Sequence, residues 1–456
     1  MPSIHDFATW RPLLELVRDA NADLLASPGG HVSGRIGRGS WSVPFIRVRP
    51  QPGRALLMDD VHVEHAAVKR VLAALKDDGR RDIAFAAEIS PDGRTILYLI
   101  DLGSAVERGI GAFPGTLVLV EDSVPEPWRR APEPVRAAPP VSSARLALLE
   151  RVLRERLPDA VGATEAEIAA TQARIGVELP EELRVLYRVT RARWEDWVDA
   201  DAGAERLAER IGCELFDLEL VYLAEPATRP SPWRFAAMEA VHTPPGAAVQ
   251  GLVGSPGWIV FGDNGRGDRL AVDLTPGPGG RVGQIISLPH EESTGADVLA
   301  DSLLDFVTRR FSERRHDPRG RQTPAVARIN VRGLQSVEAA AHPGLEVLSI
   351  GAWDREPLSL APVLGLPRLR TLTARPGTLA DPLEIAGLTG LEFLELGSDD
   401  WRILVDAGAV PRGLSACVIE PRGKEHPTPV ADLANELLVR WGRPAITQTI
   451  LEGRVD

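Results

Sequence analysis

Trp258-Ile-Val-Phe-Gly-Asp-Asn-Gly-Arg-Gly-Asp-Arg-Leu-Ala-Val-Asp-Leu274 is the most informative segment for the fold of the middle of this 456-residue chain. The aromatic and β-branched residues of Trp258–Phe261 are typical of a buried strand, and Leu270–Leu274 repeats that character. Between them, the glycines and aspartates of Gly262–Asp268 have the composition of a tight connection. The segment therefore predicts two antiparallel strands joined by a turn.

The flanking sequence extends this unit in both directions. A second glycine-rich bend at Thr275–Gly280 leads to another apolar run at Val282–Leu288, and we expect a closing helix over Asp297–Phe311. Upstream, Thr164-Glu-Ala-Glu167 is a capping box, and Pro180 favours the start of a second helix. A meander flanked by helices predicts an α+β domain, to which we assign residues 144–316.

Five features of this region occur together in one order. They are Leu179-Pro-Glu-Glu-Leu183 with Tyr187, Gly262-Asp263-x-x-x-Gly267-Asp268, Ala271-Val-Asp273-Leu274, Pro276-Gly-Pro-Gly-Gly280-Arg-Val-Gly-Gln-Ile-Ile286, and Ala300-Asp-Ser302. In this order the region, about 165–311, resembles the SUKH superfamily, which includes a yeast cell-wall-synthesis regulator and many bacterial immunity proteins. The resemblance implies a protein-binding domain without a catalytic site. The family's usual Asn-Gly turn after the second helix is replaced by Thr190-Arg-Ala192, so the specificity of that surface cannot be carried over.

Residues 121–143 contain six prolines, which predicts a semi-extended linker between the SUKH-like domain and an N-terminal domain, 1–120. The N-terminal domain has the pattern of an αββαββ sandwich, although Gly34–Gly39 reads as a loop. Its expected elements are a helical stripe from Phe7 to Leu25, strands at Val43–Val48 and Ala55–Met58, a helix at Val63–Leu75, and a hairpin whose turn is Ser90-Pro-Asp-Gly93.

The C-terminal part, 317–456, repeats the pattern LxxLxL. The four copies are Leu345–Ile350, Leu369–Ala374, Leu391–Leu396 and Leu414–Ile419. Their spacing of about 23 residues resembles a leucine-rich repeat, so we expect a short solenoid with a helical cap at Val430–Trp441. In such a strand array Arg370, Phe393 and Glu395 would face outward, and we expect them to bind a partner.

Composition excludes several classes of function. The net charge of −12 argues against a nucleic-acid binder, because such proteins need clustered cations to bind phosphates. Only three lysines occur, and no GxxxxGK[ST] loop is present, which disfavours ATP-driven and lysine-dependent enzymes. Two distant cysteines and the lack of a long apolar run favour a cytoplasmic location with no membrane partner.

The carboxylates Asp263, Asp268 and Asp273 could be taken for a metal or acid/base cluster. We favour a structural turn, because aspartates in glycine-rich turns accept hydrogen bonds from nearby amides and the calcium-loop order is absent. His62 and His65 are the one close histidine pair, but no further ligand accompanies them. We therefore expect no catalytic residue, metal or cofactor.

An acidic run is the strongest candidate for a binding surface. Residues 195–219 contain nine carboxylates and two arginines. The run fits either a solvated helix face or an acidic docking surface with aromatic anchors. The candidate residues are Trp194, Glu195, Asp196, Trp197, Asp199, Asp201, Glu205 and Glu209.

The combined prediction is a non-catalytic protein-binding protein. We expect a bacterial immunity protein that blocks a toxin domain, such as a basic nuclease, or a multivalent adaptor of the same lineage. A basic partner would fit the acidic run, since residues 144–316 hold 28 acidic and 20 basic side chains. The alternative is a hydrolase or nucleotide-processing enzyme with its site in residues 1–120. The sequence leaves the oligomeric state open.

Overall fold

The chain forms two units, and the first is built from both of its ends. The computed structural model describes residues 3–45, 58–107, 116–119, 123–135, 139–197, 200–310, 325–421 and 425–456. One unit combines Met1–Ser123 with Ala327–Asp456, and the other is Val124–Val326. This grouping differs from the expected division, which placed 1–120 and 317–456 in separate domains.

Two strand pairings join the ends of the first unit. Strand β18 (Thr447–Arg454) lies antiparallel to β4 (Arg94–Asp101) along its whole length. Strand β6 (Thr116–Leu119) lies antiparallel to β17 (Ala416–Glu420). Local sequence patterns do not reveal such pairings, because the partner strands are hundreds of residues apart in the sequence.

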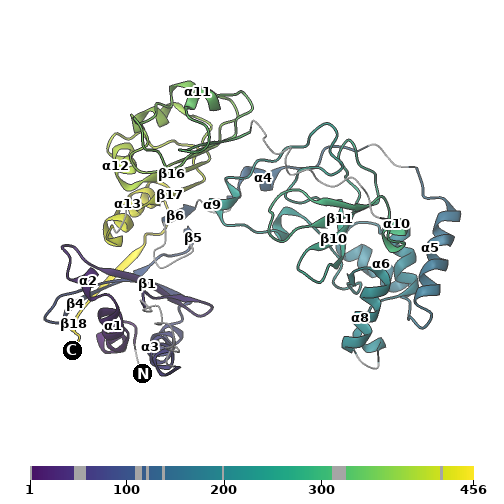
Figure 1. Ribbon diagram of the computed structural model, residues 1–456, viewed down its shortest axis with the longest axis horizontal. Helices are drawn as coiled ribbons and strands as arrows, with labels where there is room; N and C mark the ends of the chain where they lie inside the picture. Colours follow the sequence, from purple (N-terminus) through teal and green to yellow (C-terminus); the bar gives the residue numbers. More distant parts are fainter. Residues whose placement is uncertain are drawn as a thin grey trace. The chain divides into compact units, whose positions relative to one another are not determined.

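The first sheet of this unit has the order β18-β4-β3-β1-β2. Its elements in chain order are α1 (Phe7–Ala20), α2 (Ala22–Leu25), β1 (Val32–Gly37), β2 (Trp41–Ser42), α3 (Met58–Asp77), β3 (Asp82–Ile89) and β4. Helices α1 and α3 cover one face of the sheet (Figure 1), where Trp10, Leu14 and Val71 are fully buried. The predicted β3–β4 hairpin is confirmed, since Ser90 and Arg94 bond across the turn.

Two expectations for this sheet were wrong. The segment expected to be a loop, Gly34–Gly39, instead contains the end of β1, where the absence of a side chain on Gly34 lets the Phe85 ring pack against the backbone. The strand expected at Val43–Val48 is absent over its described part, 43–45. Apart from Met58, which begins α3, the strand expected at Ala55–Met58 lies outside the described residues.

The second sheet of the first unit has the order β13-β14-β15-β16-β17-β6-β5. Its elements are β5 (Val106–Glu107), β6, β13 (Val326–Ile329), α11 (Val337–Ala340), β14 (Val347–Ile350), η4 (Ala361–Val363), β15 (Thr371–Ala374), η5 (Pro382–Gly387), β16 (Phe393–Gly397), α12 (Ser398–Asp406), β17 and α13 (Pro427–Arg440). Strands β14 to β17 are parallel, and the register aligns Leu348, Leu372, Leu394 and Cys417 in a buried row. The LxxLxL segments thus form one mixed sheet, extended by β6 and β5 from the N-terminal part.

The second unit contains an antiparallel sheet of order β12-β11-β10-β9-β7, with β8 also paired to β9. Its elements are α4 (Glu126–Arg129), α5 (Ser143–Arg156), α6 (Glu165–Ile175), α7 (Glu181–Val189), η1 (Trp194–Asp196), α8 (Ala200–Ile211), β7 (Glu214–Leu215), β8 (Tyr222–Leu223), η2 (Pro226–Thr228), α9 (Trp233–Ala236), β9 (Trp258–Asp263), β10 (Arg269–Asp273), β11 (Gln284–Leu288), β12 (Asp297–Ala300) and α10 (Leu303–Val307). The predicted capping box, Thr164 with Glu167, is present at the start of α6. Figure 1 places α5, α6 and α10 together beside the sheet.

The end of this unit differs from the helix expected over Asp297–Phe311. The first four residues form β12, which pairs with β11, because Val298 and Ala300 alternate toward the core with the period of a strand. Ser302 then caps the short helix α10 by accepting a hydrogen bond from the Asp305 amide.

The proline-rich segment 121–143 is attached to the second unit over much of its described part. Trp128 Nε1 donates to the Arg229 carbonyl at 3.0 Å, and the Arg130 guanidinium donates to the Val241 carbonyl at 2.8 Å. These side chains anchor a segment whose proline content predicted a linker. None of the helices in the described ranges has an apolar stretch long enough to cross a bilayer.

Candidate functional site

The turn between β9 and β10 is organised by the Asp263 carboxylate. Asp263 Oδ1 accepts hydrogen bonds from the amides of Gly265 at 2.7 Å and Gly267 at 3.4 Å, and Asp263 Oδ2 pairs with Arg269. Both glycines have positive φ, 76° and 99°, which residues with side chains seldom adopt. The carboxylate therefore satisfies backbone donors within its own turn.

Asp268 connects the same turn to the segment after β11. Its Oδ1 accepts from the His290 amide at 3.0 Å and lies 2.8 Å from His290 Nδ1, while Oδ2 accepts from Asn264 Nδ2 at 2.7 Å. Partial burial opposes ionisation, but the bonds to His290 hold the pKa of Asp268 below its ordinary value. The same contact raises the pKa of His290.

Asp273 is wholly buried at the end of β10. It accepts from the Thr275 amide and from Gln284 Nε2, both at 2.8 Å, and burial raises its pKa to about 6. Each of the three aspartates thus has its own set of donors. Within the described ranges, no group of three or more His, Cys, Asp or Glu side chains is placed to hold a metal ion.

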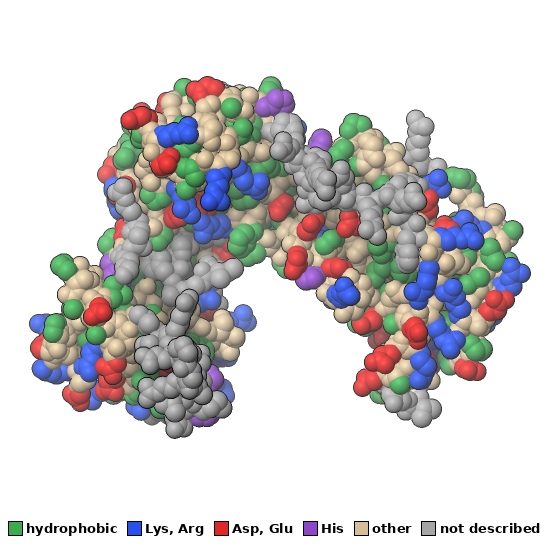
Figure 2. Space-filling model, viewed as in Figure 1, with side chains coloured by type: hydrophobic (Ala, Val, Ile, Leu, Met, Phe, Trp, Pro, Cys, Tyr) green, Lys and Arg blue, Asp and Glu red, His purple; other side chains and the backbone are tan. Residues whose placement is uncertain are grey.

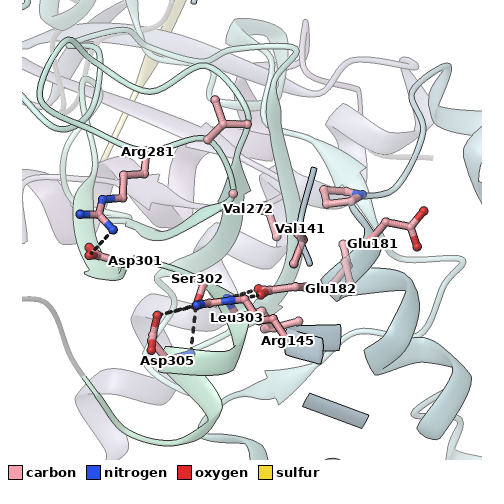
Figure 3. A pocket seen from close by; sticks show the side chains of 14 residues that line it. Val141, Arg145, Glu181, Glu182, Val272, Arg281, Asp301, Ser302, Leu303 and Asp305 are labelled. Carbon is pink, nitrogen blue, oxygen red and sulfur yellow. Dashed lines mark hydrogen bonds and ion pairs between the residues drawn. The ribbon is translucent and has the colours of Figure 1, made fainter. Parts of the chain in front are cut away.

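A pocket of about 230 Å³ opens on the second unit (Figure 3). It is lined by Val141, Arg145, Pro180, Glu181, Glu182, Leu183, Val272, Arg281, Val282, Gly283, Asp301, Ser302, Leu303 and Asp305. Four of the five sequence features that carry the family resemblance contribute to this lining. Segments that are separate in the sequence therefore meet at one place on the surface.

Three hydrogen bonds among the pocket residues converge on the Arg145 guanidinium (Figure 3). Its Nε donates to Glu182 Oε1 at 2.8 Å, and its Nη2 donates to Asp305 Oδ2 at 3.0 Å and to Ser302 Oγ. Glu182 is 7% exposed, and its second oxygen accepts from the Leu303 amide at 2.8 Å. Burial lowers the pKa of Arg145, but the bonds to Glu182 and Asp305 outweigh it and raise that pKa.

Sequence reasoning missed Arg145. It lies in α5, which precedes the recognised motifs in the sequence. Arginine is so abundant in this chain that an arginine at one position does not indicate a site. Glu182 was noticed within Leu179–Leu183, but only as part of a helix start. A buried carboxylate needs a cationic partner, yet the sequence does not show that Glu182 is buried.

The structure separates the members of the acidic run. Asp196 is held by Arg191 in a two-bond ion pair, with 2.8 Å between Arg191 Nε and Asp196 Oδ2 and 2.6 Å between Nη2 and Oδ1. These bonds lower the pKa of Asp196 despite its partial burial. Asp196 therefore has a local structural partner. Asp199 lies outside the described residues.

The two tryptophans of this region have different environments. Trp194 is 66% exposed, whereas Trp197 packs against the hydrophobic core of the second unit. A side chain on Gly203 of α8 would collide with the Trp197 ring, which shows how closely the ring lies on the helix. Trp194 is therefore available as a surface anchor, whereas Trp197 is part of the packing between η1 and α8.

The remaining acidic candidates lie on the surface. Asp201, Glu205 and Glu209 are spaced four residues apart on α8, so they share one exposed face, and Glu195 is exposed in η1. Within the described part of the chain, none of these four carboxylates forms an ion pair. Figure 2 shows acidic side chains over the outer end of α8, with basic ones nearby. We call Glu195, Asp201, Glu205 and Glu209 the α8 acidic face.

The expected binding face of the parallel strands is not exposed. Phe393 is wholly buried, and Arg370 and Glu395 are 7% and 6% exposed. The Arg370 guanidinium lies 3.5 Å from a carboxylate oxygen of Glu346, which is also buried. Assigning Phe393 as an exposed aromatic anchor was wrong, because the repeat pattern gives the direction of a side chain but not what packs over it.

Comparison with known proteins confirms the resemblance for the central part of the chain. Residues 162–309 match the model of the SMI1/KNR4 family (SUKH-1). The chain therefore contains a SUKH-1 domain, which includes the five features that carry the resemblance, the acidic run and most of the pocket. Arg145 and Val141 of the pocket lie before the matched residues.

The similar curated proteins are fungal. The chain is 27% identical over 158 residues to a cell wall biosynthesis/cell cycle regulator of Schizosaccharomyces pombe, an alignment of 32% of this chain and 30% of that protein. It is 29% identical over 116 residues to a glucan synthesis regulatory protein of Neurospora crassa, covering 25% and 22%. The matches span less than a third of either relative, and both relatives are named as regulators.

Proposed function

We propose that this chain is a non-catalytic protein-binding protein whose SUKH-1 domain docks its partner through Trp194 and the α8 acidic face. The observation that carries the proposal is that the Trp194 ring is exposed on η1, which packs against α8, and that the four carboxylates of the α8 acidic face form no ion pairs among the described residues. An aromatic anchor within a charged surround is typical of protein interfaces. The regulatory names of the relatives support a role in binding.

The partner that fits this surface is a basic protein. Carboxylates can take the place of nucleic-acid phosphates on a basic active surface, so a nuclease toxin is the specific partner class we favour. Immunity to such a toxin is then the more specific role that we propose, and an adaptor function is the alternative outcome of the test. We further propose that the four parallel strands form a leucine-rich-repeat-like scaffold, with no binding role assigned to Phe393.

Affinity capture with the full chain tests the docking surface. The test variants are Trp194→Ala and the triple change Asp201→Ser, Glu205→Ser and Glu209→Ser, and the control is Asp354→Ser with Glu356→Ser, which removes exposed charge from the other unit. We expect the control to retain a captured protein that both test variants lose. Identification of that protein as a basic nuclease supports immunity, and any other partner supports an adaptor.

The kinetics of the captured pair provide a second test. An acidic face that steers a basic partner gives fast association at low ionic strength, and salt slows that association steeply. The triple change should lower the association rate and flatten its salt dependence, whereas Trp194→Ala should chiefly accelerate dissociation. An association rate that neither salt nor the triple change alters would contradict docking through this face.

A further inference from the structure

Three acceptors of the SUKH-1 domain form a preorganised cradle for one guanidinium group. Glu182 comes from the start of α7, while Ser302 and Asp305 come from the start of α10. Ser302 Oγ donates to Asp305 Oδ2 at 2.6 Å, and the Leu303 amide donates to Glu182 at 2.8 Å, so the acceptors are held in place by contacts of their own. We call Glu182, Ser302 and Asp305 the arginine cradle.

The residue that fills the arginine cradle comes from outside the matched domain. All three acceptors lie within residues 162–309, but Arg145 belongs to α5, which precedes the match. The cradle is therefore part of the SUKH-1 domain, and Arg145 is an addition from a neighbouring helix. Its guanidinium occupies the cradle within this chain.

The chemistry of the cradle selects guanidinium over other cations. Glu182 is nearly buried, and a buried carboxylate without a cation is costly. Glu182 accepts a hydrogen bond from Arg145 Nε, and Asp305 accepts one from Nη2. A planar guanidinium can donate to two separate acceptors in this way, because its N–H groups point in fixed, different directions. The donors of a lysine ammonium all lie on one nitrogen atom, so they cannot reach acceptors that are as far apart as those of the cradle.

The fold allows Arg145 to leave without displacing its helix. Arg145 lies in the first turn of α5, and its side chain is 38% exposed. The helix is anchored further along by Leu149 and Leu153, which are fully buried. A rotation of the Arg145 side chain would thus empty the cradle while both leucines stay packed. The adjoining pocket, with exposed Val141 and Arg281 among its lining residues, offers a path for a second arginine.

We propose that the arginine cradle is a binding site for an arginine side chain, that Arg145 occupies it in cis, and that an arginine of the partner protein competes with Arg145 for it. The part concerning the partner rests on the function proposed above, whereas the existence of the site does not. The cradle would then add recognition of one basic side chain to docking through the α8 acidic face.

Chemical rescue of the full chain tests the cradle. Arg145→Ala should lower the melting temperature of the second unit by about 5 °C, because it leaves Glu182 without a cation. Ethylguanidinium at about 10 mM should restore about 2–4 °C, since it binds the folded state alone. Ethylammonium should restore much less. Arg154→Ala on the same helix, where Arg154 pairs with Glu150 on the surface, is the matched control and should gain nothing.

The wild-type chain should also gain nothing from ethylguanidinium, because Arg145 fills the site. Equal effects on wild type and both variants, or no effect on Arg145→Ala, would overturn the proposal. If Arg145→Ala does not fold, Arg145→Gln gives the same test, and its refolding yield with and without ethylguanidinium supplies the readout. Partner capture is measured separately: its failure removes the proposed function, whereas absent rescue removes the cradle alone.

Discussion

His290 Nδ1 lies 2.8 Å from Asp268 Oδ1, and this contact ties the Gly262–Asp268 turn to the segment that follows β11. The backbone amide of His290 donates to the same oxygen. The ring therefore adds a charge-dependent bond to one that does not depend on protonation. The contact raises the pKa of His290 and lowers the pKa of Asp268. Both side chains are therefore charged at mildly acidic pH.

Replacing His290 by Asn should destabilise the second unit in a pH-dependent manner. The stabilisation by His290 is complete below its ordinary pKa of 6.5 and is lost as pH rises through the raised value. The melting-temperature difference between wild type and variant should therefore be larger at about pH 5.5 than at about pH 8.5. The buried Asp273 titrates in both proteins, so its contribution cancels from the melting-temperature difference. His5→Asn, at an exposed position, is the control; a difference independent of pH would show that the ring acts only by packing.

Asp268→Ala should lower the melting temperature of the second unit. Metal ions should not change the melting temperature of the variant or of the wild-type chain. The change removes acceptors for Asn264 and His290, at a cost of about 1–3 kcal/mol. Calcium or magnesium at millimolar levels should leave the melting temperature of the wild-type chain unchanged. A rise of several degrees with either ion would mean that these carboxylates bind metal.

Trp194→Ala and Trp197→Ala should separate binding from stability. Trp197 packs against the core and α8, so its removal should cost about 2–4 kcal/mol, while loss of the exposed Trp194 ring should cost little. Urea denaturation of both variants measures the difference. Equal stability of the two proteins would be inconsistent with the packing of Trp197.

Phe393→Ala should destabilise the first unit by about 3–5 kcal/mol, because the ring is wholly buried. Leu383→Ala removes a side chain that is 41% exposed and should have a smaller effect. Urea denaturation again provides the measurement. If Phe393→Ala retained full stability, the ring would not be part of the packed interior.

Deleting Thr447–Asp456 should destabilise the first unit and reduce its solubility. The deletion removes β18, which pairs with β4 from Arg94 to Asp101, and leaves the backbone groups of β4 at an open sheet edge. Removal of exposed Asp456 alone is the control. Light scattering during heating would detect aggregation, and equal behaviour of both truncated chains would argue against a structural role for β18.

Features whose causes are local could be predicted from the sequence. The Thr164–Glu167 capping box and the Ser90–Gly93 turn depend on residues a few positions apart, so their hydrogen bonds could be predicted from the local sequence. The SUKH-1 motifs were recognisable for the same reason, since each is a contiguous run. The alternation in Val298–Ala300 was also present, but the longer apolar pattern after it favoured a helix.

Patterns in the sequence were enough to identify the SUKH-1 domain, the row of aligned leucines and the acidic composition of the middle region. The pairing of β18 with β4 and the burial of Phe393 became evident in the folded protein alone. Folding also brought Arg145 to Glu182, 37 residues away. The physical reason is that burial and ion pairing depend on which distant segments pack together, whereas caps, turns and periodicity depend on neighbours along the chain.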